Sequence, residues 1–141
     1  MTIQNMFRDS KRNLKCLVVV GTRPEAIKMA PVIAELTASE RCDPVVCLSG
    51  RHPEMAAQAL SMCGITAEIS LARVDAKGDL SVGMGHVLRE FSPVLADVKP
   101  DWVLVHGDTM TTLSATLAAF HAQTRVAHVE AGLRTGAMRR P

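Results

Sequence analysis

Two patterns of apolar residues alternate along the chain. Nearly continuous apolar runs, such as residues 14–20 and 102–106, are typical of strands that are buried on both faces of a sheet. Longer segments between such runs, such as residues 80–98, carry apolar residues at helical spacing. We therefore expect strands at residues 14–20, 44–48, 67–71, 102–106 and 125–129, separated by helices at residues 22–39, 53–64, 80–98 and 109–121.

Strands that alternate with helices of this length predict an α/β fold. Parallel β-α-β units with right-handed crossovers give a Rossmann-like, doubly wound sheet with helices on both faces. We expect the strand order 3-2-1-4-5, which reverses between the first and the fourth strand. In such sheets ligands bind beyond the carboxyl ends of the strands, at the point of reversal.

Local signals predict where helices begin and where they are interrupted. Thr22 and Glu25 stand at the spacing of a capping box, which favours a helix start after Gly21. Pro31 lies inside the same helix and predicts a kink or a break at the preceding residue. In the next helix we expect one shared face, formed by Met55, Ala59, Leu60 and Cys63.

Composition and charge narrow the class of protein. The 141 residues suffice for one domain, which we place at residues 14–141, after an N-terminal extension of residues 1–13 that we expect to be disordered. A net charge of +2 is too small for a nucleic-acid or membrane partner, and no run approaches the ~20 apolar residues of a membrane span. The four cysteines form no CxxC pair, which favours reduced, buried thiols in a cytoplasmic protein.

Charged residues follow the predicted strands on one edge of the sheet. Arg23 and Lys28 flank a helix start whose free N–H groups favour an anion, although two solvated cations on a capped helix are the simpler alternative. Asp108 either caps the helix that follows it or acts as an acid or base. Glu130 ends a strand with no evident helix to cap, so it either pairs with a nearby arginine or takes part in chemistry.

The sequence predicts neither a metal nor a nucleotide cofactor. The five histidines never form a close metal-ligand pair. Gly21 lacks the two further glycines of a dinucleotide-binding turn, and the second strand ends in LSGR at residues 48–51, without an acid for a ribose. We therefore expect no cofactor.

Three motifs in this chain closely resemble those of the non-hydrolysing UDP-N-acetylglucosamine 2-epimerases. They are GTRPEAIKMAP at residues 21–31, VHGDT at residues 105–109 and HVEAGLRTG at residues 128–136. The resemblance covers residues 14–136 and implies the N-terminal, Rossmann-like half of a two-domain, GT-B-like enzyme. It also implies interconversion of UDP-N-acetylglucosamine and UDP-N-acetylmannosamine for cell-surface polysaccharides, without metal or nicotinamide, by a homodimer.

The chemistry that the resemblance implies accounts for the residue types. Family members are understood to expel UDP, forming a 2-acetamidoglucal, and to add it back after inversion at C2, which requires cations at the diphosphate and groups that exchange protons. By motif position, Arg23 and Lys28 belong to the substrate and phosphate site, and Asp108 and Glu130 are substrate-binding residues and candidate catalytic acids and bases. His52 falls at a regulatory site for the substrate, with Arg51 in place of the usual glutamine.

The resemblance also predicts parts that lie outside these 141 residues. A Pro-Glu-Glu motif with another catalytic glutamate is expected almost directly after Pro141, and a second domain is expected to hold the uridine and to supply a catalytic histidine. We therefore expect the chain alone to be a truncated, inactive form. Two alternatives stay open: half of a hydrolysing epimerase or related glycosyltransferase, and a non-catalytic remnant or binding module.

Overall fold

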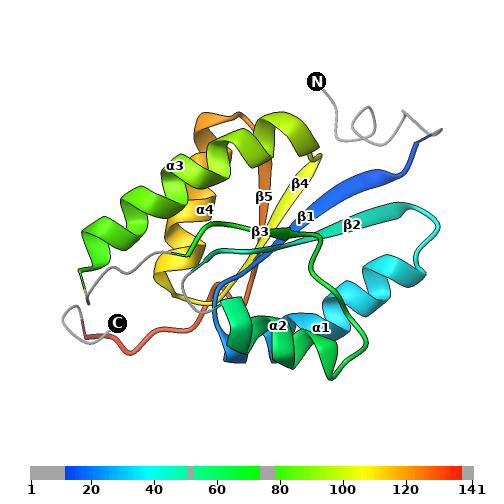
Figure 1. The fold of residues 1–141 in the computed structure, drawn as a ribbon, viewed down its shortest axis with the longest axis horizontal. Helices are drawn as coiled ribbons and strands as arrows, with labels where there is room; N and C mark the ends of the chain where they lie inside the picture. The colour runs from blue at the N-terminus through cyan, green and yellow to red at the C-terminus, as the bar shows by residue number, and fades with distance from the viewer. Residues whose placement is uncertain (1–11, 51–52, 74–78, 138–141) are drawn as a thin grey trace.

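A five-stranded parallel sheet forms the centre of the protein (Figure 1). The computed structural model describes residues 12–50, 53–73 and 79–137. The order β3-β2-β1-β4-β5, with every neighbouring pair parallel, confirms the predicted topology. The strands are β1 (Leu14–Val20), β2 (Cys42–Leu48), β3 (Ile69–Ser70), β4 (Trp102–His106) and β5 (Arg125–Val129).

Four helices in the described ranges cover the two faces of this sheet. The helices are α1 (Arg23–Ala38), α2 (Pro53–Ser61), α3 (Leu80–Val98) and α4 (Met110–His121). Figure 1 shows α1 and α2 on one face and α3 and α4 on the other. Because both faces are covered, every strand residue of the central β1 from Cys16 to Val20 is buried, which explains its unbroken apolar run.

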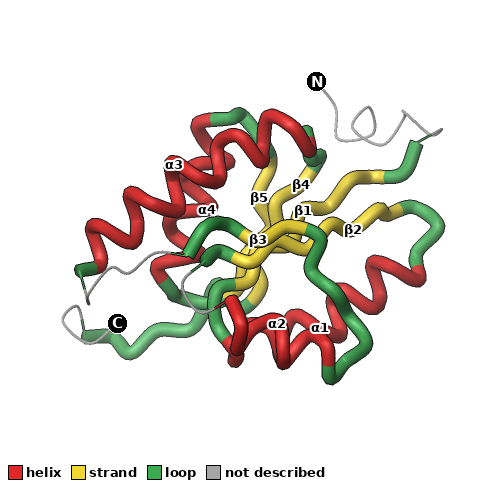
Figure 2. The backbone as a smooth tube through the Cα atoms, in the orientation of Figure 1, coloured by secondary structure: helices red, strands yellow, loops and turns green. Residues whose placement is uncertain are grey.

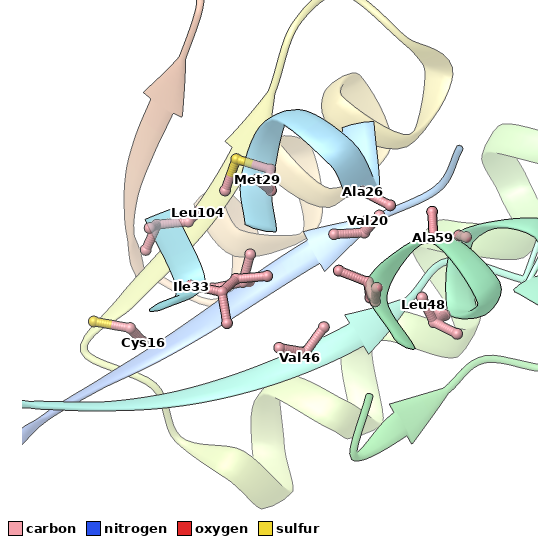
Figure 3. Close-up of a cluster of buried hydrophobic side chains, with 12 residues drawn as sticks. Cys16, Val20, Ala26, Met29, Ile33, Val46, Leu48, Ala59 and Leu104 are labelled. Atoms are coloured by element: carbon pink, nitrogen blue, oxygen red, sulfur yellow. The ribbon is translucent and has the colours of Figure 1, made fainter. Parts of the chain in front are cut away.

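The side chains of β1 divide the core into two clusters. Val18 and Val20 contribute to the cluster beneath α1 and α2 (Figure 3), whereas Leu17 and Val19 contribute to the cluster beneath α3 and α4. Burying one such side chain stabilises the fold by about 1.5–3 kcal/mol. The strands that carry the loops at the carboxyl edge are therefore packed on both faces of the sheet.

The predicted break at Pro31 is wrong, because α1 continues through this residue. Pro31 is exposed, and so is Ile27, whose carbonyl loses its helical partner and is left to water. Met29 and Ile33 are buried on either side of Pro31, so packing holds the helix together across the missing hydrogen bond. The helix α3 likewise runs unbroken through Pro93.

The predicted apolar face of α2 is partly wrong. Its buried residues are Ala56, Ala59 and Leu60, whereas Met55 is 52% exposed. The helix ends at Ser61, so Cys63 falls in the turn beyond it and is exposed, contrary to the expectation of buried thiols. Only a narrow face of this short helix packs against the sheet, and Met55 lies at the edge of that face.

The strand β3 is shorter than the predicted residues 67–71. It pairs with β2 at only two positions, Cys47↔Ile69 and Leu48↔Ser70. Next to these positions, the N–H of Val46 donates to Oε2 of Glu68 at 2.6 Å. A side chain thus takes the place of the backbone carbonyl that would accept this bond if β3 were longer. The strand β2, in turn, begins two residues before the predicted start, at Cys42.

Candidate functional site

The loops that follow β1, β4 and β5 lie side by side at the carboxyl edge of the sheet (Figure 2). This arrangement follows from the parallel pairing of β1 with β4 and of β4 with β5. Arg23 begins the helix after β1, Asp108 lies in the turn after β4, and Glu130 follows β5. The fold thus brings the predicted site residues to one edge.

The turn between β1 and α1 is fixed by the buried Glu25. Its Oε2 accepts the N–H groups of Gly21 at 2.5 Å and of Thr22 at 3.0 Å, while the Thr22 hydroxyl accepts the N–H of Glu25. The predicted capping box is therefore present. A Cβ atom on Gly21 would lie 2.1 Å from Oγ1 of Thr111, so only glycine fits this turn.

An ion pair joins Lys28 on α1 to Glu130 after β5. Nζ of Lys28 lies 2.9 Å from Oε1 and 2.8 Å from Oε2 of Glu130. A third group, Nε2 of His106 at the end of β4, lies 3.0 Å from the same Oε2. His106 is only 6% exposed, whereas the side chains of Lys28 and Glu130 are 52% and 33% exposed. The carboxylate thus connects a buried imidazole to a cation that solvent and ligands can reach.

These partners favour the ionised form of Glu130. Hydrogen bonding from Lys28 lowers the pKa of this carboxyl, partial desolvation opposes the shift, and the bond from His106 adds to it. An ionised carboxylate only accepts hydrogen bonds, so Nε2 of His106 is the donor. At neutral pH, the side chain of Glu130 is therefore a negatively charged carboxylate.

The backbone of Glu130 adopts a conformation that is unusual for its residue type. Its φ angle of 60° lies in the left-handed region, which few residues other than glycine enter. Such strain costs about 1–3 kcal/mol and is found most often at functional sites. In this chain it turns the main chain sharply at the end of β5 while the side chain reaches back to α1 and β4.

The alternative that Asp108 caps the following helix is wrong. The N-cap of α4 is Thr109, whose Oγ1 accepts the N–H of Thr112 at 3.3 Å. Asp108 is exposed, and its carboxylate makes no hydrogen bond or ion pair with any other residue that the structure describes. Gly107, with φ at 70°, makes the turn that carries it outward. The carboxylate is thus available to a ligand.

Arg23 and His52 complete the set of predicted residues. Arg23 is exposed in the first turn of α1, and within the described ranges no residue hydrogen-bonds to or pairs with its guanidinium. His52, the candidate regulatory residue, lies outside the described residues. Among residues 12–50, 53–73 and 79–137, no group of three or more His, Cys, Asp or Glu side chains is arranged to hold a metal ion.

Sequence reasoning missed His106 as a member of this site. The residue closes an apolar strand, which made it indistinguishable from a packed strand histidine. No signal in the sequence marked it, because its place beside Glu130 depends on the pairing of His106 with Val129 on β5, the residue that precedes Glu130. Register between two strands follows from the fold and not from either strand alone.

The sequence model of the family described as UDP-N-acetylglucosamine 2-epimerase matches residues 34–141, well over half of the chain. The chain belongs to this family. The UDP-N-acetylglucosamine 2-epimerase of Neisseria meningitidis is 48% identical over 122 residues, and that of Escherichia coli K12 is 44% identical over 128 residues. These matches cover 86% and 91% of this chain but only 33% and 34% of the two relatives.

Solved structures of the family agree with this membership. The crystal structure of the Neisseria meningitidis UDP-GlcNAc 2-epimerase bound to UDP-GlcNAc has a TM-score of 0.85 and 46% identity, with 91% of this chain and 35% of that chain covered. The Methanocaldococcus jannaschii enzyme in complex with UDP-GlcNAc and UDP has a TM-score of 0.75 and 33% identity, with 86% and 34% covered. The chain thus spans about a third of the length of its relatives.

In the part of the chain that the structure describes, no helix combines the length and the apolar character that crossing a bilayer requires.

Proposed function

We propose that residues 14–141 form the N-terminal, Rossmann-like domain of a cytoplasmic enzyme that epimerises UDP-N-acetylglucosamine at C2. The observation that carries the proposal is the contact of Glu130 with both Lys28 and His106, beside the N-terminus of α1. Two structural relatives were solved with UDP-GlcNAc bound, which supports a UDP-sugar as the ligand. The product would serve the synthesis of cell-surface polysaccharides.

Arg23, Lys28 and the start of α1 suit the diphosphate. The N-terminus of a helix attracts anions through its free N–H groups and its dipole. Arg23 is exposed there without a described partner. The Lys28 ammonium has three N–H donors and directs two of them at the two oxygens of Glu130, so one donor is left for a phosphate oxygen. These cations would stabilise the negative charge of the departing UDP.

Asp108 and Glu130 suit the two proton transfers. In the forward half-reaction, a base removes the C2 proton, the C1–O bond to UDP breaks, and a C1=C2 double bond forms. In the return half-reaction, an acid delivers a proton to the opposite face of C2 while the β-phosphate oxygen of UDP adds to C1. Glu130 and Asp108 would share these roles. The partners of Glu130 favour its ionised form, and Asp108 is exposed after β4, the strand next to the one that Glu130 follows.

The proposal is tested on a protein of the family's full length, here named the completed enzyme. It consists of this chain followed by the part of the Neisseria meningitidis relative that lies beyond the matched region. We expect the completed enzyme to be a homodimer, as analytical ultracentrifugation would show, and to convert UDP-N-acetylglucosamine to UDP-N-acetylmannosamine. The variant Asp108→Asn should lose this conversion and keep its fold.

Product analysis separates the alternatives. A hydrolysing epimerase would release free N-acetylmannosamine and UDP in equal amounts, whereas the proposed enzyme leaves the sugar nucleotide intact. A non-catalytic binding module would give no product of either kind but would still release or absorb heat in a calorimetric titration with UDP-N-acetylglucosamine. Absence of the epimer would reject the proposal, and binding heat without any product would favour the non-catalytic binding module.

A further inference from the structure

Two histidines on neighbouring strands each bond to the loop that follows the other strand. Nε2 of His106 on β4 lies 3.0 Å from Oε2 of Glu130, which follows β5. Nε2 of His128 on β5 lies 2.6 Å from the carbonyl oxygen of Gly107, which follows β4. The parallel register places Val105 opposite His128 and His106 opposite Val129, so the two bonds cross between the strands in opposite directions.

We propose that this histidine pair, His106 and His128, positions the two candidate catalytic carboxylates. His106 holds Glu130 by a direct bond to its side chain, and His128 holds Asp108 through the peptide that precedes it. The inference rests on the proposed function, because it assigns these two residues to the same reaction. It adds positioning residues and leaves the substrate unchanged.

His128 acts on Asp108 through the backbone that anchors it. The Asp108 carboxylate makes no hydrogen bond or ion pair within the described part of the chain, so its position is set by its backbone. Two bonds fix the backbone of Gly107 on either side of its Cα atom: its N–H donates to the carbonyl of Val129 at 2.9 Å, and its carbonyl, in the peptide that joins it to Asp108, accepts from His128. His128 is exposed and contributes little to the core, so a packing role does not explain it.

His106 is buried and keeps one ring nitrogen without a hydrogen bond among the described residues. The ring is 6% exposed, and its Nδ1 is buried without a hydrogen-bond partner among the described residues. An apolar side chain, such as those of its neighbours on β4, would avoid that cost of desolvation. The imidazole forms one hydrogen bond to the side chain of Glu130. This bond orients the carboxylate, which the left-handed backbone of Glu130 alone does not do.

Both bonds require the same tautomer. A carbonyl oxygen and an ionised carboxylate can only accept, so each ring must carry a proton on Nε2. In the 141-residue chain with ¹⁵N-labelled histidine, the ring nitrogen shifts should show protonated Nε2 at both His106 and His128. A neutral ring protonated only on Nδ1, at either position, would overturn the inference.

Turnover of the completed enzyme supplies the second test. A glutamine side chain can place an N–H near the position of Nε2, whereas asparagine is too short. We expect His106→Asn and His128→Asn to lower kcat roughly 10–100-fold with KM within about threefold, because small displacements of reacting groups have effects of this size. The glutamine variants should recover most of kcat. The inference fails if asparagine and glutamine variants are equally active or if all keep full kcat.

The two tests separate this inference from the proposed function. If the unmodified completed enzyme produces no epimer, the proposed function fails, while the ring nitrogen shifts still decide whether the two bonds exist. Circular dichroism of each variant controls for loss of fold, and the exposed position of His128 makes its variants the cleaner pair.

Discussion

The ammonium of Lys28 lies within 2.9 Å of both carboxylate oxygens of Glu130, although 102 residues separate the two along the chain. The contact joins the first turns of α1 to the residue after β5, across the intervening β4. It therefore links two of the three family motifs and fixes the position of the Glu130 carboxylate in the site.

Removing the Lys28 cation should raise the pKa of Glu130 toward its ordinary value. The hydrogen bond from Lys28 is the largest cause of the lowered pKa, so Lys28→Met should raise this pKa and leave the contribution of His106. Titration of the Glu130 carboxyl by ¹³C NMR measures the change. The matched control, Lys99→Met, lies at the opposite edge of the sheet and should not move this pKa. An unchanged pKa in Lys28→Met would contradict the ion pair.

Asp108→Asn should leave stability nearly unchanged. Because Thr109 caps α4, the Asp108 side chain supports no helix end, and we expect a change of less than about 0.5 kcal/mol in the free energy of unfolding. Thr109→Ala, one residue away, should cost about 1 kcal/mol through the lost cap. Urea unfolding of both variants checks the difference. Equal losses would return the capping role to Asp108.

Gly21→Ala should destabilise the protein, because the added Cβ would meet Oγ1 of Thr111 at 2.1 Å and Oγ of Ser49 at 2.7 Å. Overpacking of this kind costs about 1–3 kcal/mol. Gly85→Ala is the matched control: its Cβ meets nothing within 4 Å in α3, and alanine favours the helix by up to about 1 kcal/mol. Thermal unfolding should therefore move in opposite directions for the two variants, and a shared direction would be inconsistent with the tight turn.

The cysteines should differ sharply in reactivity. Burial raises the pKa of Cys16 to about 11 and that of Cys47 to about 12, so neither forms much thiolate at pH 8, whereas Cys63 is exposed. Iodoacetamide followed by mass spectrometry should modify Cys63 and spare Cys16 and Cys47 in the folded protein. All four should react in urea. Modification of Cys47 without denaturant would mean that this strand is not buried.

The pair of Arg12 and Asp101 should make stability depend on acid pH. Hydrogen bonding from Arg12 holds the pKa of Asp101 below its ordinary value, and the N–H of Lys15 adds to the effect. The folded pKa is depressed, so the contribution is complete above the unfolded pKa of about 3.9 and is lost as pH falls through the folded value. The difference in unfolding free energy between wild type and Asp101→Asn should therefore shrink below about pH 4. A difference that is constant with pH would refute the pairing.

The sequence predicted the architecture better than the contacts within the site. The unbroken apolar run of β1 and the capping box at Thr22 and Glu25 are local signals, and both were correct. The prediction of a break at Pro31 was wrong because the lost hydrogen bond is a local effect. The packing of Met29 and Ile33, which keeps the helix intact, is a tertiary effect that the sequence does not show. Met55 misled because helical spacing does not say which arc of α2 faces the sheet.

The edge of the sheet that carries the candidate site could be predicted, but its bonding could not. Topology alone brings Arg23, Asp108 and Glu130 to the same edge. The bond from His106 to Glu130 depends on the register of β4 against β5 and on the left-handed turn at Glu130, neither of which has a sequence signal. The choice of Thr109 over Asp108 as the cap depends on where α4 begins, to within one residue.

In the proposed function, Asp108 and Glu130 move the C2 proton of a UDP-sugar. The most direct test of these roles is ¹H NMR of UDP-N-acetylglucosamine incubated with the completed enzyme in D₂O. We predict deuterium at C2 in the epimer and in recovered substrate, and loss of this exchange in Asp108→Asn and Glu130→Gln. Formation of the epimer with its C2 hydrogen retained, or exchange that persists in both variants, would contradict the account.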